Sequence, residues 1–326
     1  MGLGLFVMLP AAGATDAVPR REPIVHTFSI VARDPATGQL GVAVQSHWFS
    51  VGPIVPWAEA GVGAVATQSM VKVSYGPLGL KRMRDGQAAP DALAALLAED
   101  DGRDVRQVAM IDAQGRVNVH TGVKCIASAG HHVGDGYSVQ ANLMHNDRVV
   151  PAMRQAYETA TGELADRMLA ALEAAQAAGG DIRGQQSAAI VVVSGEKTDE
   201  PWQGRLMELR VEDHLRPVAE LKRLVRLHRA YEHSNRGDEL VEKKQFDDAL
   251  QAYAKAAELA PEIVELKFWQ AVTLFSAHRE DEAAKLFREV FTKEPVWVEV
   301  VPRVVPLGLL PDDAAVLKRV TDLAPK

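Results

Sequence analysis

The chain has 326 residues, of which 47% are hydrophobic and 24% are charged, the composition of an ordinary globular protein. Its 43 acidic and 36 basic residues give a formal net charge of −7, which excludes the basic excess typical of proteins that bind nucleic acid. The single cysteine, Cys125, excludes an intramolecular disulfide framework and a cysteine-rich metal site. No apolar run approaches the ~20 residues that a membrane span needs.

The first 14 residues form an apolar stretch that ends in Ala12-Gly13-Ala14, the small-x-small pattern that signal peptidase accepts. This pattern predicts a periplasmic or secreted protein. No Lys or Arg precedes the apolar run, so a cytoplasmic location stays open as the alternative. We assign residues 1–26 to a signal or pro-segment.

Short β-type runs begin after this segment. Residues 28–32 and 40–45 flank a Pro- and Gly-containing turn at 34–38, which predicts a hairpin. Further strands are expected at 61–69, 105–111, 116–120, 137–143, 187–193 and 206–211, and helices at 76–84, 91–98, 149–159 and 163–178. This order of strands and helix pairs predicts two stacked sheets with a helical layer on each outer face.

From Pro217 onward the pattern is helical only, beginning with a helix at 217–230, and it contains an internal repeat. Ala249, Tyr253 and Pro261 recur as Ala283, Phe287 and Pro295, at the tetratricopeptide period of about 34 residues. Small residues recur where paired helices would cross closely. We therefore expect a helical tetratricopeptide-like domain over residues 216–326, which could bind a protein partner.

Six runs carry a family resemblance: residues 27–32, 41–47, 56–68, 129–131, 136–143 and 183–189. They resemble the bacterial family called domain of unknown function 1028, which is grouped with the N-terminal-nucleophile hydrolases. With the helical repeats, the resemblance implies an α+β protein. Its four-layer αββα N-terminal-nucleophile hydrolase-like sandwich spans residues 27–215 and is followed by an all-α helical repeat domain. It also implies a hydrolytic role inherited from the superfamily.

Thr27 is the candidate nucleophile that the resemblance implies. A threonine hydroxyl attacks only when a base takes its proton, and a free α-amino group with a pKa of about 7.7–8.0 suits that task. Inside a peptide bond the same nitrogen is not basic, so Thr27 could act only once residues 1–26 are removed by a cut after His26. The alternative is that Thr27 is a β-favouring residue that starts a strand.

One departure from the superfamily lies on the second strand, where an Asp, a Ser and a basic residue are expected. Here the run is Gln45-Ser46-His47, and the lysine expected on a neighbouring strand has no counterpart. His47 could supply positive charge or accept a proton, or it could be a structural histidine after a strand.

The remaining candidates are polar residues at strand ends. We assign two sets of polar residues, Gln68 with Ser69 and Ser138 with Gln140 and Asn142, each to one strand face, where they could hold an oxyanion. The alternative is that these polar faces meet solvent. Asp181, Arg183 and Ser187 precede or begin a strand, either to orient the amino terminus or to form a turn held by an Asp–Arg pair. The expected catalytic residues are Thr27, His47, Gln140, Asn142 and Asp181, and the expected substrate-binding residues are Gln45, Ser46, Gln68, Ser69, Arg183 and Ser187.

Other chemistry has weaker support. Cys125 could be a thiol nucleophile, but a single buried thiol is usually an inert apolar group. His131 and His132 are adjacent on a strand and point to opposite faces, which disfavours a shared metal. We expect no metal and no cofactor, since the sequence also has no specific phosphate-binding loop.

Three functional hypotheses follow. The first is an amide-bond hydrolase that acts on a small amide or short peptide by acyl transfer to Thr27. The second is a catalytically silent fold of the same kind that serves as a binding or scaffold protein through its helical repeats. The third is an enzyme that uses His47 or Cys125 without N-terminal processing. Homo-oligomerisation stays open.

Overall fold

The computed structural model describes residues 24–200 and 202–325. The expected signal-peptidase pattern at residues 12–14 lies outside these residues. None of the helices in the described part of the chain is long and apolar enough to cross a membrane.

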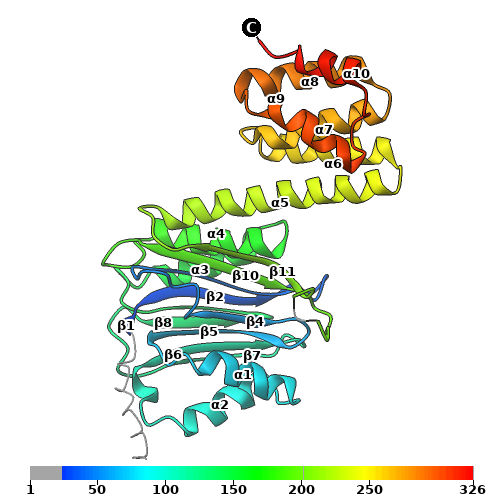
Figure 1. Ribbon diagram of the computed structural model, residues 1–326. Coiled ribbons are helices and arrows are strands. Elements are labelled where there is room, and N and C mark those ends of the chain that lie inside the picture. The colour runs from blue at the N-terminus through cyan, green and yellow to red at the C-terminus, as the bar shows by residue number, and fades with distance from the viewer. Residues whose placement is uncertain (1–23, 201, 326) are drawn as a thin grey trace, which may run out of the picture.

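Two antiparallel sheets stack at the centre of the protein (Figure 1). The first has the order β11-β10-β3-β2-β9-β8 and contains β2 (Thr27–Arg33), β3 (Leu40–Ser46), β8 (Gly130–Gly134), β9 (Tyr137–Ala141), β10 (Ser187–Val193) and β11 (Arg205–Val211). The second has the order β1-β5-β6-β7, with β4 also paired to β5, and contains β1 (Ile24–Val25), β4 (Pro56–Glu59), β5 (Gly63–Met70), β6 (Arg106–Asp112) and β7 (Val117–Thr121).

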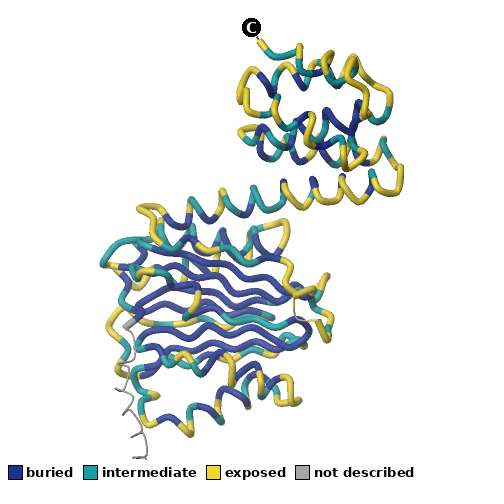
Figure 2. Tube along the Cα trace, in the orientation of Figure 1, coloured by how far each residue is buried: buried dark blue, intermediate teal, exposed yellow. Residues whose placement is uncertain are grey.

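Both faces of the central strands are buried, which explains why these strands are almost continuously apolar (Figure 2). Alternate residues belong to different apolar clusters. Val42 and Val44 lie in the cluster between the sheets, whereas Phe28, Ile30 and Ala43 pack toward helices. The predicted turn between β2 and β3 is confirmed, with Asp34 Oδ1 accepting two backbone N–H bonds.

Helices cover each outer face and complete the four predicted layers (Figure 1). Helices α1 (Tyr75–Arg84) and α2 (Ala89–Ala98) lie on the second sheet, with a 3₁₀ turn at Arg103–Val105 after them. Helices α3 (Val149–Thr159), α4 (Leu164–Ala177) and the first half of α5 (Pro217–Glu242) lie on the first sheet. The expected α+β class is confirmed.

The C-terminal segment consists of helices, as expected. After α5 come α6 (Phe246–Leu259), α7 (Val264–Ser276), α8 (Glu280–Lys293), α9 (Trp297–Val300), a 3₁₀ helix at Val301–Leu307 and α10 (Ala314–Thr321). The repeat residues Ala249 and Tyr253 in α6, and Ala283 and Phe287 in α8, are all buried.

Helix α5 is longer than the sequence predicts, because it continues past residue 230 to Glu242. Its second half packs on α6 through Ala230, Ser234 and Gly237, which are small and give no apolar periodicity. A Cβ added at Gly237 would lie 2.7 Å from the Tyr253 ring, so this glycine allows the two helices to approach closely.

Candidate active site

The topology gathers the predicted site residues at one end of the sandwich. Strands β2 and β10 begin there and β3 and β9 end there, while β5 ends and β6 begins at the same end of the second sheet. Six non-glycine residues in the described chain have positive φ, and four of them lie in segments at this end: Ser50, Ser69, Ser128 and Leu143. Such strained backbone is often concentrated at functional sites.

Thr27 begins β2 and is fully buried. It pairs with Ser46 of β3, and its hydroxyl donates to the Val25 carbonyl at 3.0 Å. Its own carbonyl accepts from the backbone N–H of Asn142 at 3.1 Å and from Gln68 Nε2 at 3.3 Å. In the uncut chain Thr27 is therefore fixed in position and closed off from solvent.

Two donors hold the carbonyl of His26, the residue before Thr27. Ser46 Oγ donates to it at 2.6 Å and Arg183 Nη2 at 2.8 Å. Hydrogen-bond donors aimed at a carbonyl oxygen, one of them charged, stabilise the negative charge that develops there when a nucleophile attacks the carbon. The carbonyl oxygen of the peptide bond between His26 and Thr27 is thus held by one neutral and one charged donor.

Asp181 holds the Arg183 guanidinium in place. Its carboxylate, with a fully buried side chain, accepts from Arg183 Nε at 3.0 Å and from Nη2 at 2.7 Å. It also accepts the backbone N–H groups of Arg183 and His47. The Asp–Arg pair that the sequence suggested is present, and it also carries a donor to the candidate cleavage site.

The His26 ring lies against Asn142 on the other side of the peptide. Asn142 Oδ1 can only accept, so His26 Nδ1–H donates to it across 2.7 Å. Burial is the main reason why the pKa of His26 lies below its ordinary value, and the nearby positive charge of Arg183 lowers the pKa further. His26 is therefore neutral at pH 7.

Gln107 on β6 is a site residue that the sequence analysis missed. Its Oε1 accepts from Asn142 Nδ2 at 2.9 Å and from Gln68 Nε2 at 2.7 Å. Its Nε2 donates to the Ala141 carbonyl and to Thr121 Oγ1. Gln107 thereby fixes which end of the Asn142 amide faces His26. The available signal was a glutamine on the apolar face of a predicted strand.

A chain of hydrogen bonds extends this network between the sheets. Ser138 Oγ donates to Gln140 Oε1, Gln140 Nε2 to Ser29 Oγ, and Ser29 Oγ to Gln68 Oε1. Gln140 and Asn142 therefore lie on the predicted face. Their amide donors, however, contact Ser29, Gln107 and the Thr27 carbonyl, whereas the His26 carbonyl accepts from Ser46 and Arg183.

Two other expected site residues face away from Thr27. Gln45 pairs with Phe28 and so points toward the helices, where both polar atoms of its side chain lack a partner within the described chain. Ser69 follows Gln68, so alternation turns its side chain away from Gln68, and its hydroxyl interacts with the Cys125 thiol. Grouping neighbouring polar residues ignored this alternation.

His47 and Ser187 have structural contacts. The His47 backbone N–H bonds to Asp181, while its ring Nδ1 is buried, lacks a partner among the described residues and faces Gly184. Ser187 Oγ donates to the Trp48 carbonyl at 2.5 Å and accepts from Val51 N. Ser187 thus anchors the segment that follows β3.

The alternative chemistry gains no support from the contacts. The Cys125 thiol donates to the Arg106 carbonyl, and burial raises its pKa, which keeps it protonated. His131 bonds to Thr121, and His132 packs near the Tyr137 ring. No cluster of three metal-ligating side chains occurs among the described residues.

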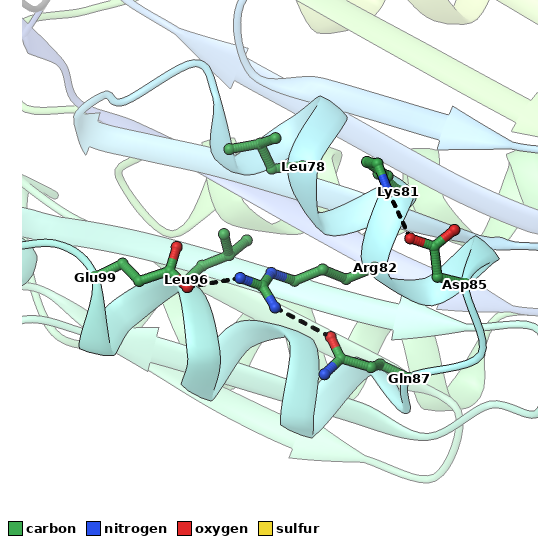
Figure 3. Close-up of a pocket in the computed structure, with 7 residues that line it drawn as sticks. All are labelled: Leu78, Lys81, Arg82, Asp85, Gln87, Leu96 and Glu99. Carbon is green, nitrogen blue, oxygen red and sulfur yellow. Dashed lines mark hydrogen bonds and ion pairs between the residues drawn. The ribbon is translucent and has the colours of Figure 1, made fainter.

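A hollow of about 550 Å³ lies between α1 and α2, on the outer face of the second sheet (Figure 3). Its charged groups pair with one another, Lys81 with Asp85 and Arg82 with Glu99. Because these pairs are exposed, we assign the hollow to the solvated helix surface.

The network predicts opposite effects for two buried glutamines. Gln107→Met removes the acceptor of two buried amide donors and should lower the free energy of unfolding by about 3 kcal/mol. Gln45→Met, the matched control, removes a buried amide that has no partner among the described residues, and it should leave stability unchanged or raise it by about 1 kcal/mol. Urea denaturation measures both, and equal losses would contradict the assignment.

Asp100 should make stability depend on pH. Burial by itself would raise its pKa, but hydrogen bonds from Arg106 and Lys72 outweigh it and bring the pKa to about 2, from 3.8. Because the pKa is lower in the folded state, the ionised Asp100 carboxylate stabilises the fold by about 2 kcal/mol above pH 3.8. This stabilisation is lost as the pH falls toward 2. The stability difference between wild type and Asp100→Asn should therefore shrink between pH 5 and pH 2. A constant difference in urea denaturation would argue against this.

Comparison with known proteins places the chain in a family. The model of the family described as "Family of unknown function (DUF1028)" matches residues 27–221. The chain is also similar to a protein from Silicibacter pomeroyi whose crystal structure is described as DUF1028. The two sequences are 31% identical and the structures superpose with a TM-score of 0.55, over 61% of this chain and 84% of that chain. A search of the curated proteins found no match. The chain belongs to the DUF1028 family.

Proposed function

We propose that this protein is an amide-bond hydrolase whose nucleophile is Thr27, and that it cuts its own chain between His26 and Thr27 to become active. The observation that carries the proposal is the pair of donors, Ser46 and Arg183, on the carbonyl that would be attacked. The match to the family also begins at Thr27, which supports this residue as the first of the working enzyme.

The cut would proceed through an ester. The Thr27 hydroxyl breaks its hydrogen bond to the Val25 carbonyl and attacks the His26 carbonyl carbon. The peptide C–N bond breaks, and the hydroxyl proton ends on the Thr27 nitrogen. Water then hydrolyses the ester, which gives a carboxylate on His26 and restores the hydroxyl. Ser46 and Arg183 hold the negative oxygen in both steps.

The mature enzyme would use its new amino terminus as the base. The free amine of Thr27 takes the hydroxyl proton, the hydroxyl attacks a substrate amide, and the departing amine receives that proton. Arg183 would supply the positive charge for which the sequence offers no lysine, since it reaches the residue next to Thr27. A nearby positive charge lowers the pKa of an amine, which favours its basic form at neutral pH.

The mass of the purified protein tests this proposal. The full chain, expressed and incubated at neutral pH, should convert to a species with the mass of residues 27–326, with Thr27 found first by N-terminal sequencing. Active protein that still carries residues before Thr27 would contradict the mechanism and leave the fold assignment intact.

The alternative is a silent fold that binds a partner through its C-terminal helices. One observation favours it: a groove of about 280 Å³ among α5, α6 and α7, lined by Tyr253 and Trp269 with Asp238 and Glu242 beside them. An aromatic groove with acidic neighbours suits a basic peptide side chain. Under this alternative the chain would stay uncut and would still bind its partner.

A further inference from the structure

The last residues before the proposed cut form part of the second sheet. The two-residue strand β1 pairs antiparallel with β5, Ile24 with Met70 and Val25 with Ser69. It lies on the same side of β5 as β4, which pairs further along that strand. We call residues 1–26 the leader. Its residues Ile24 and Val25 thus extend the second sheet at the end where the candidate site lies.

Each of the two residues nearest the cut has its own surroundings. Val25 is fully buried and belongs to the apolar cluster between the sheets. His26 is almost fully buried, with its ring on Asn142 and its carbonyl on Ser46 and Arg183. A segment held only by its covalent link to Thr27 would not need these contacts.

The groups that hold residues 24–26 remain in the protein after the cut, because they belong to Thr27 and to the chain that follows it. Once residues 1–26 leave, the backbone groups of Ser69 and Met70 lose their strand partner. The apolar position that Val25 filled, the amide oxygen of Asn142, and the two donors to the His26 carbonyl, Ser46 and Arg183, then become available to a ligand together. An unpaired strand edge binds extended peptides through main-chain hydrogen bonds, while pockets beside it select side chains.

We infer that the substrate is an extended peptide that takes the place of residues 24–26: it adds a strand to β5, buries an apolar β-branched side chain where Val25 lies, and presents an uncharged hydrogen-bond donor to Asn142. This inference rests on the proposed function and deepens it. The residue at the His26 position is the acyl donor, so its carbonyl meets Ser46 and Arg183 beside Thr27.

Burial supports an uncharged side chain at that position. His26 is almost fully buried, so a charge there would lose its hydration, and the nearby Asp181 and Arg183 form an ion pair with each other that offers no net charge in compensation. The low pKa of the buried His26 imidazole agrees with this selection. A small isolated amide would use the two carbonyl donors and leave the β5 edge and the Val25 space unfilled.

Peptide binding tests the inference apart from catalysis. The protein used is the Thr27→Ala chain that begins at residue 27, which retains the whole region matched by the family and loses only Val25 from the core. Circular dichroism confirms its fold. Acetyl-Ile-Val-His-amide, which keeps an amide bond after His, should bind at least ten times more tightly by calorimetry than acetyl-Ile-Asp-His-amide or acetyl-Ile-Val-Glu-amide. Equal affinities, or no binding, would overturn the inference.

A variant and its control assign the side-chain preference. Asn142→Leu should abolish the preference for His over Glu and keep the preference for Val over Asp. Asn118→Leu, which replaces an exposed asparagine on β7, should change neither. If the peptides bind in the expected order but the chain that begins with Thr27 does not cleave them, the inference stands and the proposed function fails.

The full chain provides a second measurement if the shortened protein does not fold. Val25→Asp should slow release of the leader at least tenfold, because a carboxylate would enter the apolar cluster, whereas Val25→Ile should release it at the wild-type rate. Intact mass against time gives both rates. Equal rates for Asp and Ile, with cleavage still at His26, would overturn the substrate inference and leave the self-cleavage mechanism standing.

Discussion

Thr27→Ala in the full chain is expected to abolish release of the leader, so that the protein keeps its unprocessed mass after prolonged incubation. Alanine lacks the oxygen that attacks the His26 carbonyl, and loss of a nucleophile costs on the order of 10³-fold or more in rate. Thr27→Ser keeps a hydroxyl at the same position and should still be cut. The fold should survive, since the variant loses one hydrogen bond, worth about 1 kcal/mol.

Thr67→Ala is the matched control for this variant. Thr67 is also a fully buried threonine of a central strand, and its hydroxyl also donates to a backbone carbonyl, that of Lys72. It should lose similar stability and release its leader at the wild-type rate. Cleavage of Thr27→Ala between the same two residues would show that another protease or another residue makes the cut.

Most of the sandwich could be predicted from the sequence because its strands are buried on both faces. Runs such as residues 188–193 are apolar throughout, and the helices between the strands have clear periodicity. The three strands without an assigned range were short or atypical: β1 has two residues, β4 begins at Pro56, and β8 contains two glycines. Their pairing depends on neighbours that sequence periodicity does not identify.

The site could be predicted only in part, because a site depends on which strands are neighbours. Alternation correctly placed Gln140 and Asn142 on one face. It also argues against Gln45, whose side chain must point away from that of Ser46. Gln107 could not be connected to Asn142, since their contact crosses between the two sheets. The role of Arg183 depends on a contact with a residue 157 positions away.

Ser46→Ala should slow release of the leader by about 10²- to 10³-fold, the usual cost of removing one oxyanion donor. The Ser46 hydroxyl donates to the His26 carbonyl, so this variant removes the donor and leaves the Asp181–Arg183 pair in place. Its matched control is Ser187→Ala. Ser187 is the cross-strand neighbour of Ser46 and is equally buried, but its hydroxyl serves the Trp48 carbonyl. The control should lose stability without slowing the cut.

Arg183→Met should slow the cut by a similar factor, because it removes the charged donor from the same oxygen. It also leaves the buried Asp181 carboxylate without its partner, which costs about 3–5 kcal/mol of stability. Rates must therefore be compared under conditions where circular dichroism shows each variant folded. Arg183→Lys keeps the positive charge and restores part of the rate if charge at the carbonyl is what matters. If Ser46→Ala and Ser187→Ala release the leader equally fast, the two donors on the His26 carbonyl hold the fold together and take no part in cleavage.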